Sequence, residues 1–75
     1  MTQLEAAYRY GADVDEASFR AIDNVREVYG IRRITFNEEE RIVRVEFDAS
    51  RLKEPVVAGL LRRAGIDIQQ KVVLA

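Results

Sequence analysis

Hydrophobic residues recur along this chain with two different periods, and each change of period marks a new element. An apolar side chain at every second position indicates a β-strand, because successive residues of a strand face opposite sides of the sheet. This pattern predicts strands over residues 3–10, 31–37, 41–48 and 66–73. The second and third strands are separated only by a polar turn at 37–40, so they are predicted to form an antiparallel hairpin.

The segment 14–29 has the period of a helix instead. Its apolar face is formed by residues three or four positions apart, with two neighbours widening it: Ala17, Ala21, Ile22, Val25, Val28 and Tyr29. We predict Asp13 as the N-cap of this helix, with Glu16 as the acidic residue of a capping box. Gly30 is well placed to end the helix in a left-handed conformation.

A second helical segment follows the hairpin. Pro55 suits its first turn, where the missing backbone N–H costs nothing, and Gly65 is a natural stop. Apolar residues between them repeat at helical spacing: Val56, Val57, Leu60, Leu61 and Ala64. The element order is therefore βαββαβ. It predicts a ferredoxin-like α+β sandwich, in which two helices cover one face of a four-stranded antiparallel sheet.

Length and charge narrow the functional classes. A chain of 75 residues is long enough for one small core, so we predict a single domain spanning residues 1–75. Its net charge of −1 argues against nucleic acid as a partner. Tyr8 and Tyr10 invite comparison with RNA-recognition domains, but the third strand lacks the Gly- and aromatic-rich run of those domains. No apolar run approaches the roughly 20 residues that span a bilayer, so we expect a cytoplasmic protein without direct membrane insertion.

The sequence contains no cysteine and no histidine. Disulfides, thiolate or imidazole metal sites, and catalysis by either residue type are therefore excluded. Ser18 and Ser50 have no histidine to activate them, and no carboxylate pair has an evident apolar cleft that would raise its pKa. We predict a protein that is not an enzyme and has no cofactor.

Several segments resemble the heavy-metal-associated domains of copper chaperones, mercury-binding proteins and metal-transporting ATPases. The resemblance covers about residues 4–73 and rests on apolar patterns and glycines: Tyr29-Gly30-Ile31, then Ile34 and Phe36, then Val43-Arg44-Val45-Glu46-Phe47-Asp48, and finally Leu60-Leu61-Arg62-Arg63-Ala64-Gly65-Ile66. It implies the same sandwich fold. It leaves open which face of the sheet Tyr8 and Tyr10 occupy, because the spacing between the first strand and Gly11 departs from the family pattern by one residue.

The resemblance also locates the place where the family binds metal. The family motif is Gly-Met-x-Cys-x-x-Cys, at the first loop and the start of the first helix. Residues 11–17 stand there in this chain, and Val14 and Ala17 occupy the two cysteine positions. Soft ions such as Cu(I) need thiolate ligands, which neither side chain supplies. The metal-carrying activity of the family is therefore not expected here.

Two other groups of residues could carry function. The carboxylates of Asp13, Asp15 and Glu16 could form a weak site for a hard cation, although such residues are also expected at a helix N-terminus. The hairpin could form an interaction surface through charged residues of both signs, namely Arg33, Arg41, Arg44, Glu38, Glu39 and Glu40. A solvated turn and a charge-balanced sheet face are the ordinary alternatives.

We therefore expect a non-catalytic interaction module of the heavy-metal-associated type without the thiolate metal site, acting as an accessory domain of a larger protein. Its predicted partner is a protein, in cis or in trans. Two alternatives remain: a metal-handling protein that uses the Asp13–Glu16 carboxylates, and a homodimer that forms through an exposed strand edge. Apolar side chains at 42, 73 and 74 would favour the second alternative if they are exposed.

Overall fold

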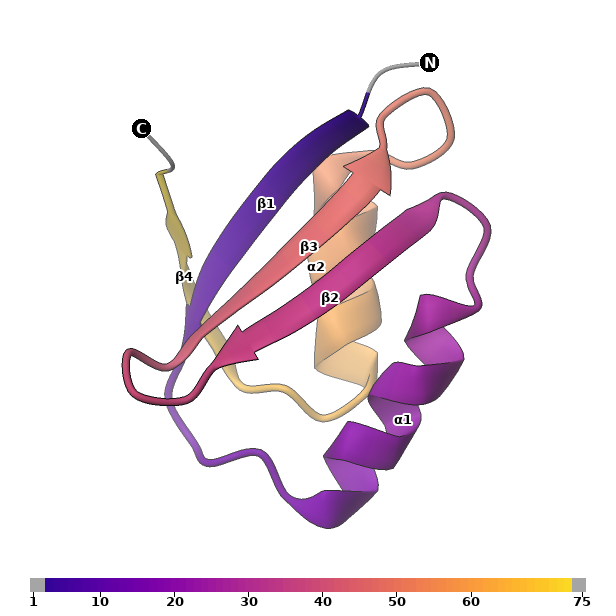
Figure 1. The fold of residues 1–75 in the computed structure, drawn as a ribbon. Helices are drawn as coiled ribbons and strands as arrows, with labels where there is room; N and C mark the ends of the chain where they lie inside the picture. The colour runs from indigo at the N-terminus through magenta and orange to yellow at the C-terminus, as the bar shows by residue number, and fades with distance from the viewer. Residues whose placement is uncertain (1–2, 74–75) are drawn as a thin grey trace.

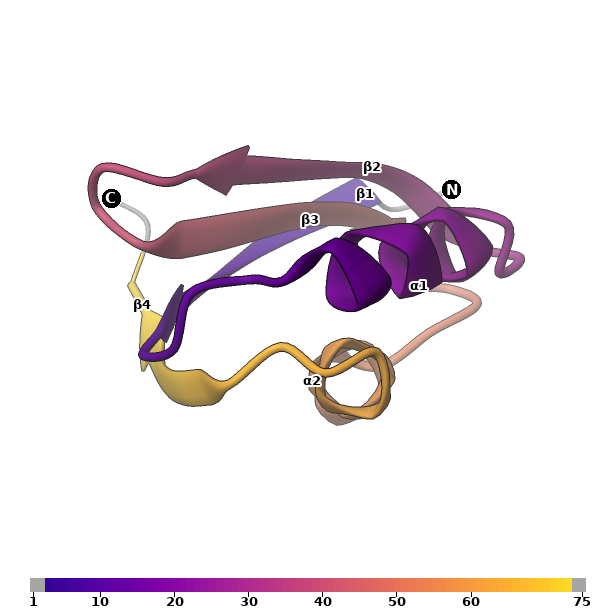
Figure 2. The same ribbon diagram turned by 90° about the horizontal axis from the view of Figure 1, so that it is seen from below.

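The computed structural model describes residues 3–73 and contains four strands and two helices in the order βαββαβ (Figure 1). The elements are β1 (Gln3–Tyr10), α1 (Glu16–Arg26), β2 (Ile31–Asn37), β3 (Ile42–Asp48), α2 (Glu54–Arg63) and β4 (Ile68–Val72). The strands form one antiparallel sheet in the order β2-β3-β1-β4. Both helices lie on the same side of this sheet, and the other face is left open (Figure 2). The predicted ferredoxin-like sandwich is confirmed.

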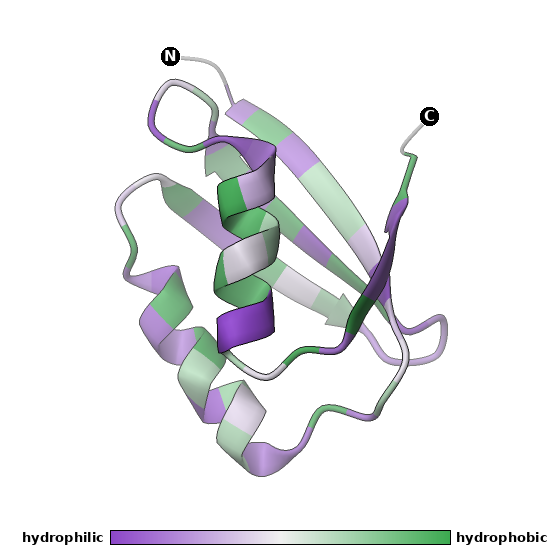
Figure 3. Ribbon diagram, turned by 180° about the vertical axis from the view of Figure 1, so that it is seen from behind, coloured by the Kyte–Doolittle hydropathy of each residue, from purple (hydrophilic) through white to green (hydrophobic). Residues whose placement is uncertain are grey.

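The core lies between the sheet and the helices. Seen from the helix side, each helix has apolar residues along part of its surface and polar residues along the rest (Figure 3). The largest fully buried side chains come from both layers: Ile22, Val43, Val45, Phe47, Val57 and Leu61. Tyr8 and Tyr10 also belong to this core, which settles the question that the sequence left open. Their apolar parity, rather than the family spacing before Gly11, decides which face they occupy.

The first helix differs from its prediction at both ends. It begins at Glu16 rather than 14, because Asp15 is the N-cap: its Oδ1 accepts a 2.7 Å hydrogen bond from the backbone N–H of Ser18. The predicted N-cap, Asp13, is wrong. The helix ends at Arg26, so Gly30 does not terminate it, although Gly30 does have a positive φ of 103° just before β2.

The predicted apolar face of α1 is right in its middle, where Ala21, Ile22, Val25 and Val28 pack in or against the core, and differs at its ends. Ser18, Ile22 and Val25 are buried, whereas Ala17 is exposed and Tyr29, beyond the helix end, is 72% exposed. The Tyr29 ring instead lies beside the guanidinium of Arg51, 4.8 Å from ring centroid to Cζ. At the start of the helix, Ser18 takes the inward position and packs beside Gly65.

The second helix and last strand follow the prediction more closely. Pro55 lies in the first turn of α2, and Gly65 follows the helix with a φ of 101°. Val56 is exposed, and Ala58 takes a buried position instead. The last strand begins at Ile68 rather than 66, because Ile66 is part of the buried connection from α2.

The two edges of the sheet differ in how far they are covered by other parts of the chain. On the β2 edge, the guanidinium of Arg26 from α1 donates a 3.0 Å hydrogen bond to the Ile34 carbonyl, which covers part of that edge. On the other side, β4 pairs only with Ala7–Tyr10, so the first half of β1 has β3 as its one neighbour among the described strands. Within residues 3–73, neither helix is long and apolar enough to cross a membrane.

A candidate binding surface at the hairpin

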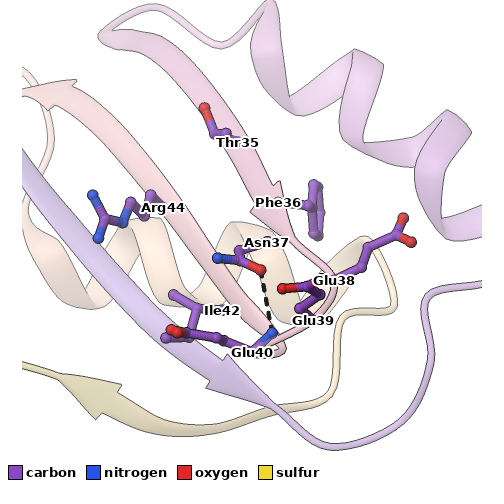
Figure 4. A pocket seen from close by; sticks show the side chains of 8 residues that line it. All are labelled: Thr35, Phe36, Asn37, Glu38, Glu39, Glu40, Ile42 and Arg44. Carbon is purple, nitrogen blue, oxygen red and sulfur yellow. Dashed lines mark hydrogen bonds between the residues drawn. The ribbon is translucent and has the colours of Figure 1, made fainter.

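A hollow of about 470 Å³ lies where the hairpin turns from β2 to β3 (Figure 4). The residues that line it come from both strands and the turn: Thr35, Phe36, Asn37, Glu38, Glu39, Glu40, Ile42 and Arg44. The turn owes its shape to two features. Asn37 Oδ1 accepts a hydrogen bond from the backbone N–H of Glu40, at 3.2 Å, and Arg41 adopts a left-handed φ of 56°. The structure therefore gathers most of the predicted hairpin residues at one end of the sheet.

The arginines of this predicted surface all have carboxylate partners. Arg33 lies 3.8 Å from Glu46, measured from Nε to Oε2, and Arg44 lies 3.5 Å from Glu5. Both pairs are partly exposed, so each contributes little to stability. They do, however, neutralise the basic side chains on the open face of the sheet. A basic patch is therefore not what this face presents.

Arg41 is directed toward the first loop instead. Its guanidinium donates a 2.6 Å hydrogen bond to the Gly11 carbonyl and lies 2.8 Å from Oδ1 of Asp13. The Arg41 carbonyl accepts a hydrogen bond from the N–H of Tyr10 at 2.9 Å. Arg41 thus links the hairpin to the loop between β1 and α1.

The glutamates of the turn are in the opposite situation. Glu38, Glu39 and Glu40 are exposed, and their carboxylates form neither an ion pair nor a hydrogen bond with any of residues 3–73. Arg9 does reach this turn, but it donates to the backbone carbonyl of Glu40. Arg41 is paired with Asp13, and the single charge of Arg9 does not balance three glutamates, so the hairpin end of the molecule is acidic.

The first loop is fixed from two sides. Besides its links to Arg41, the loop is bonded to Asp67: the backbone carbonyl of Asp67 accepts from the N–H of Gly11 at 3.0 Å, and its Oδ2 accepts from the N–H of Ala12 at 3.1 Å. Val14 is half-buried against the core, whereas Ala17 is exposed. Both side chains are aliphatic and offer no ligand atom to a metal ion.

The three carboxylates proposed for a hard cation have separate local partners. Asp13 pairs with Arg41, and Glu16 pairs with Arg20 at 2.6 Å. Asp15 caps α1, and the hydrogen bonds from Ser18 lower its pKa. Across residues 3–73 there is no group of three or more acidic, His or Cys side chains that could hold a metal ion. The described structure does not assemble these carboxylates into a cation site.

A second, smaller hollow was not anticipated from the sequence. It has a volume of about 100 Å³ and is lined by Tyr10, Asp13, Val14, Phe19 and Glu38. Next to it, the ring of Phe36 makes edge contacts with Tyr10 and Phe19, with centroids 5.9 Å and 5.3 Å apart. These residues belong to β1, the first loop, α1, β2 and the turn, so only the folded topology brings them together. No local spacing in the sequence signals this cluster.

Comparison with known proteins supports the fold and goes no further. No known protein family matches the chain by its sequence profile, and no curated protein matches it. Among solved structures, the chain is similar to oxidized MerP from Ralstonia metallidurans CH34, with a TM-score of 0.71 and 15% sequence identity. The match covers 92% of this chain and 100% of MerP. At this identity the likeness establishes a fold of the heavy-metal-associated type.

Proposed function

We propose that this protein is a non-catalytic interaction module that binds a basic segment of a partner protein at the acidic hairpin. One observation carries the proposal: the turn has three exposed glutamates whose carboxylates have no partner among residues 3–73, and these outnumber Arg9, which reaches the turn without a carboxylate partner. The adjoining hollow of about 470 Å³ adds the partly apolar surface of Ile42 and Phe36, against which the stems of Lys and Arg side chains can pack. The partner would be bound in cis or in trans.

The composition of the first loop supports a role other than carrying soft metal ions. The fold is of the heavy-metal-associated type, yet Val14 and Ala17 stand at the positions of the family's thiolates. Titration with Cu(I) or Zn(II), followed by competition with a chelator, is expected to show no tight 1:1 complex. Stoichiometric binding of either ion would contradict the proposal.

The interaction itself can be tested with a short Lys- and Arg-rich peptide added to the ¹⁵N-labelled protein. We expect amide shift changes centred on residues 36–44 and an affinity that falls as salt is raised, because exposed charges are screened. The triple variant Glu38→Gln, Glu39→Gln, Glu40→Gln should weaken binding about ten-fold or more, on the basis of about 0.5 kcal/mol or more per exposed pair. A matched control is Glu27→Gln, because Glu27 is also exposed but lies beyond the far end of α1. Equal binding by the triple variant and the control would refute the docking site.

Self-association is a second candidate function, and it rests on the open edge of the sheet. Beside β4, no further strand of the described chain continues the sheet, and Val73 is 88% exposed. Ile42, which the sequence analysis grouped with it, is buried, and Leu74 lies outside the described residues. Sedimentation equilibrium at micromolar concentration should reveal a dimer, and a monomer throughout this range would exclude a stable one.

The cytoplasmic location remains a prediction from the sequence. Cell fractionation of the native protein would test it, since recovery from any other compartment would contradict it.

A further inference from the structure

The small hollow beside the first loop combines three features that favour a positively charged ligand. Its volume of about 100 Å³ exceeds the roughly 30 Å³ that one water molecule occupies in the liquid, so it can hold an ammonium head with a few carbon atoms. Its lining includes the aromatic residues Tyr10 and Phe19, and Phe36 packs against both rings. The face of an aromatic ring attracts a cation that lies within about 6 Å of the ring centroid.

The charge around this hollow is negative. The carboxylates of Asp13 and Glu38 line it, and the guanidinium of Arg41 pairs with Asp13 at 2.8 Å. Two carboxylates and one guanidinium leave a net charge of −1. Glu38 has no ion pair within the described residues, so one monovalent cation would complete the charge balance.

Tyr10 adds a polar group to the surroundings of this hollow. Its side chain is only 3% exposed, yet its hydroxyl makes no hydrogen bond with any of residues 3–73. Among residues 3–73, every polar side-chain atom that is fully shielded from solvent has a hydrogen-bond partner. The Tyr10 hydroxyl has none, so it must reach solvent. The hollow that Tyr10 lines provides that path. Burial, and then the charge of Glu38, raise the pKa of this hydroxyl, which places Glu38 in its electrostatic surroundings.

We propose that this hollow binds an alkylammonium cation, such as the side-chain ammonium of lysine. The inference rests on the proposed function and makes it more specific. A basic partner would lie along the hairpin and insert one cationic side chain between Glu38 and the aromatic cluster of Tyr10, Phe19 and Phe36. Glu38 lines both hollows, and Phe36 lines the large one. Both side chains project from the hairpin on the side of α1, away from Arg44 (Figure 4). The two hollows are therefore adjacent parts of one surface.

The test uses three small probes followed by ¹⁵N shift changes in the whole chain. Two are cations, choline and N-acetyl-lysine methylamide, and the third is 3,3-dimethylbutan-1-ol, the uncharged carbon isostere of choline. We expect the cations to shift residues 10–19 and 36–38 and to bind at least about three-fold more tightly than the isostere, as exposed cation–π contacts allow. Tighter binding of the lysine derivative would point to a partner protein, and tighter binding of choline to a free quaternary amine. Equal binding of choline and its isostere, or shifts elsewhere, would overturn the proposal.

Variants separate this site from the general acidity of the hairpin. Glu38→Gln and Glu39→Gln remove the same charge from the same turn, but only Glu38 lines the small hollow. Glu38→Gln should weaken cation binding about five-fold and Glu39→Gln should change it less than two-fold, given that exposed charge pairs contribute up to about 1 kcal/mol. Phe19→Leu should also weaken it, and Phe19 is 37% exposed, so the fold should tolerate this change. Equal effects of the two Gln substitutions would refute the site.

Binding of the peptide and of the small cations to the parent protein distinguishes failure of this inference from failure of the proposed function. If the Lys- and Arg-rich peptide binds the hairpin but choline and the lysine derivative do not, the interaction module stands and the cation hollow is wrong. If neither the peptide nor the small cations bind, both are wrong.

Discussion

Two glycines show how differently a single methyl group should act at two positions of this chain. At Gly65, a Cβ atom would lie 2.5 Å from the hydroxyl oxygen of buried Ser18, and the φ of 101° is unfavourable for other residues. At Gly59, in the middle of α2, a Cβ atom would have no heavy atom within 4 Å. Substitution by alanine is therefore expected to change the free energy of unfolding in opposite directions at the two positions.

Gly65→Ala should lower the free energy of unfolding by about 1–2 kcal/mol or more, from backbone strain and the clash with Ser18. Gly59→Ala should raise it by about 0.5–1 kcal/mol, because alanine restricts the unfolded chain and favours the helix. Urea unfolding of both variants beside the parent protein measures the difference. A stabilised Gly65→Ala variant would contradict the close packing of Gly65 against Ser18.

Tyr8 gives a pH dependence at the alkaline end. Burial, and secondarily the charge of Glu54, raise the pKa of Tyr8 to about 12, and its hydroxyl donates a 3.4 Å hydrogen bond to the Glu54 carbonyl. The folded state therefore holds the phenol proton more tightly than the unfolded state, in which the pKa is about 10. The contribution of Tyr8 to the free energy of unfolding is therefore fully present below about pH 10 and is lost as the pH rises toward 12.

Tyr8→Phe should remove this part of the alkaline loss. Unfolding by urea at pH 9, 10 and 11 should show a steeper decline for the parent protein than for the variant. Parallel declines would mean that Tyr8 ionises with the same pKa in both states.

Some residue-level features could be predicted from the sequence, and others depend on contacts that it does not reveal. Gly65 and Pro55 were placed correctly because their backbone preferences are local. The N-cap was misassigned because Asp13 and Asp15 have the same chemistry two positions apart. The folded structure distinguishes them: Asp15 accepts from the N–H of Ser18, whereas Asp13 pairs with Arg41, 28 residues away in the sequence.

At the scale of elements, the link between the hairpin and the first loop is the feature most open to test. Arg41 makes both contacts that hold the loop from the hairpin side, to the Gly11 carbonyl and to Asp13. Arg41→Gln should speed amide hydrogen exchange in residues 11–15, while the free energy of unfolding changes by no more than about 1 kcal/mol, since the pair is exposed. Exchange that is unchanged in this loop would show that Asp67 alone fixes it.

The strands were predicted well because period-two patterning follows directly from burial on one face of a sheet. The pairing of the strands decides which charged side chains neutralise one another. The hydrophobic pattern does not reveal which strands become neighbours. Glu5 lies close enough to Arg44 to pair with it only because β1 sits beside β3 in the observed register. The predicted mixed-charge surface therefore separates into paired arginines and unpaired glutamates.

At the scale of the whole molecule, the small core leaves a narrow margin of stability. Leu61 is fully buried in α2 and packs in the single core cluster. Leu61→Ala should lower the free energy of unfolding by about 2–5 kcal/mol. A 75-residue domain has only a modest free energy of unfolding in total. Circular dichroism of the variant should therefore show a large drop in Tm or partial unfolding at 25 °C. Loss of less than about 1 kcal/mol would contradict the dense packing around Leu61.

The directions of the first and last strands, β1 and β4, determine where the ends of the domain lie relative to the acidic turn. Gln3 pairs with Asp48 at one end of the sheet, whereas Tyr10, Ile68 and the hairpin turn lie at the other. β1 starts and β4 finishes away from the acidic turn (Figure 1). An affinity tag, a fluorophore or a neighbouring domain joined ahead of β1 or after β4 would therefore be attached on the side away from the hairpin. Immobilised protein should thus present that end freely to molecules in solution, whichever terminus is tethered.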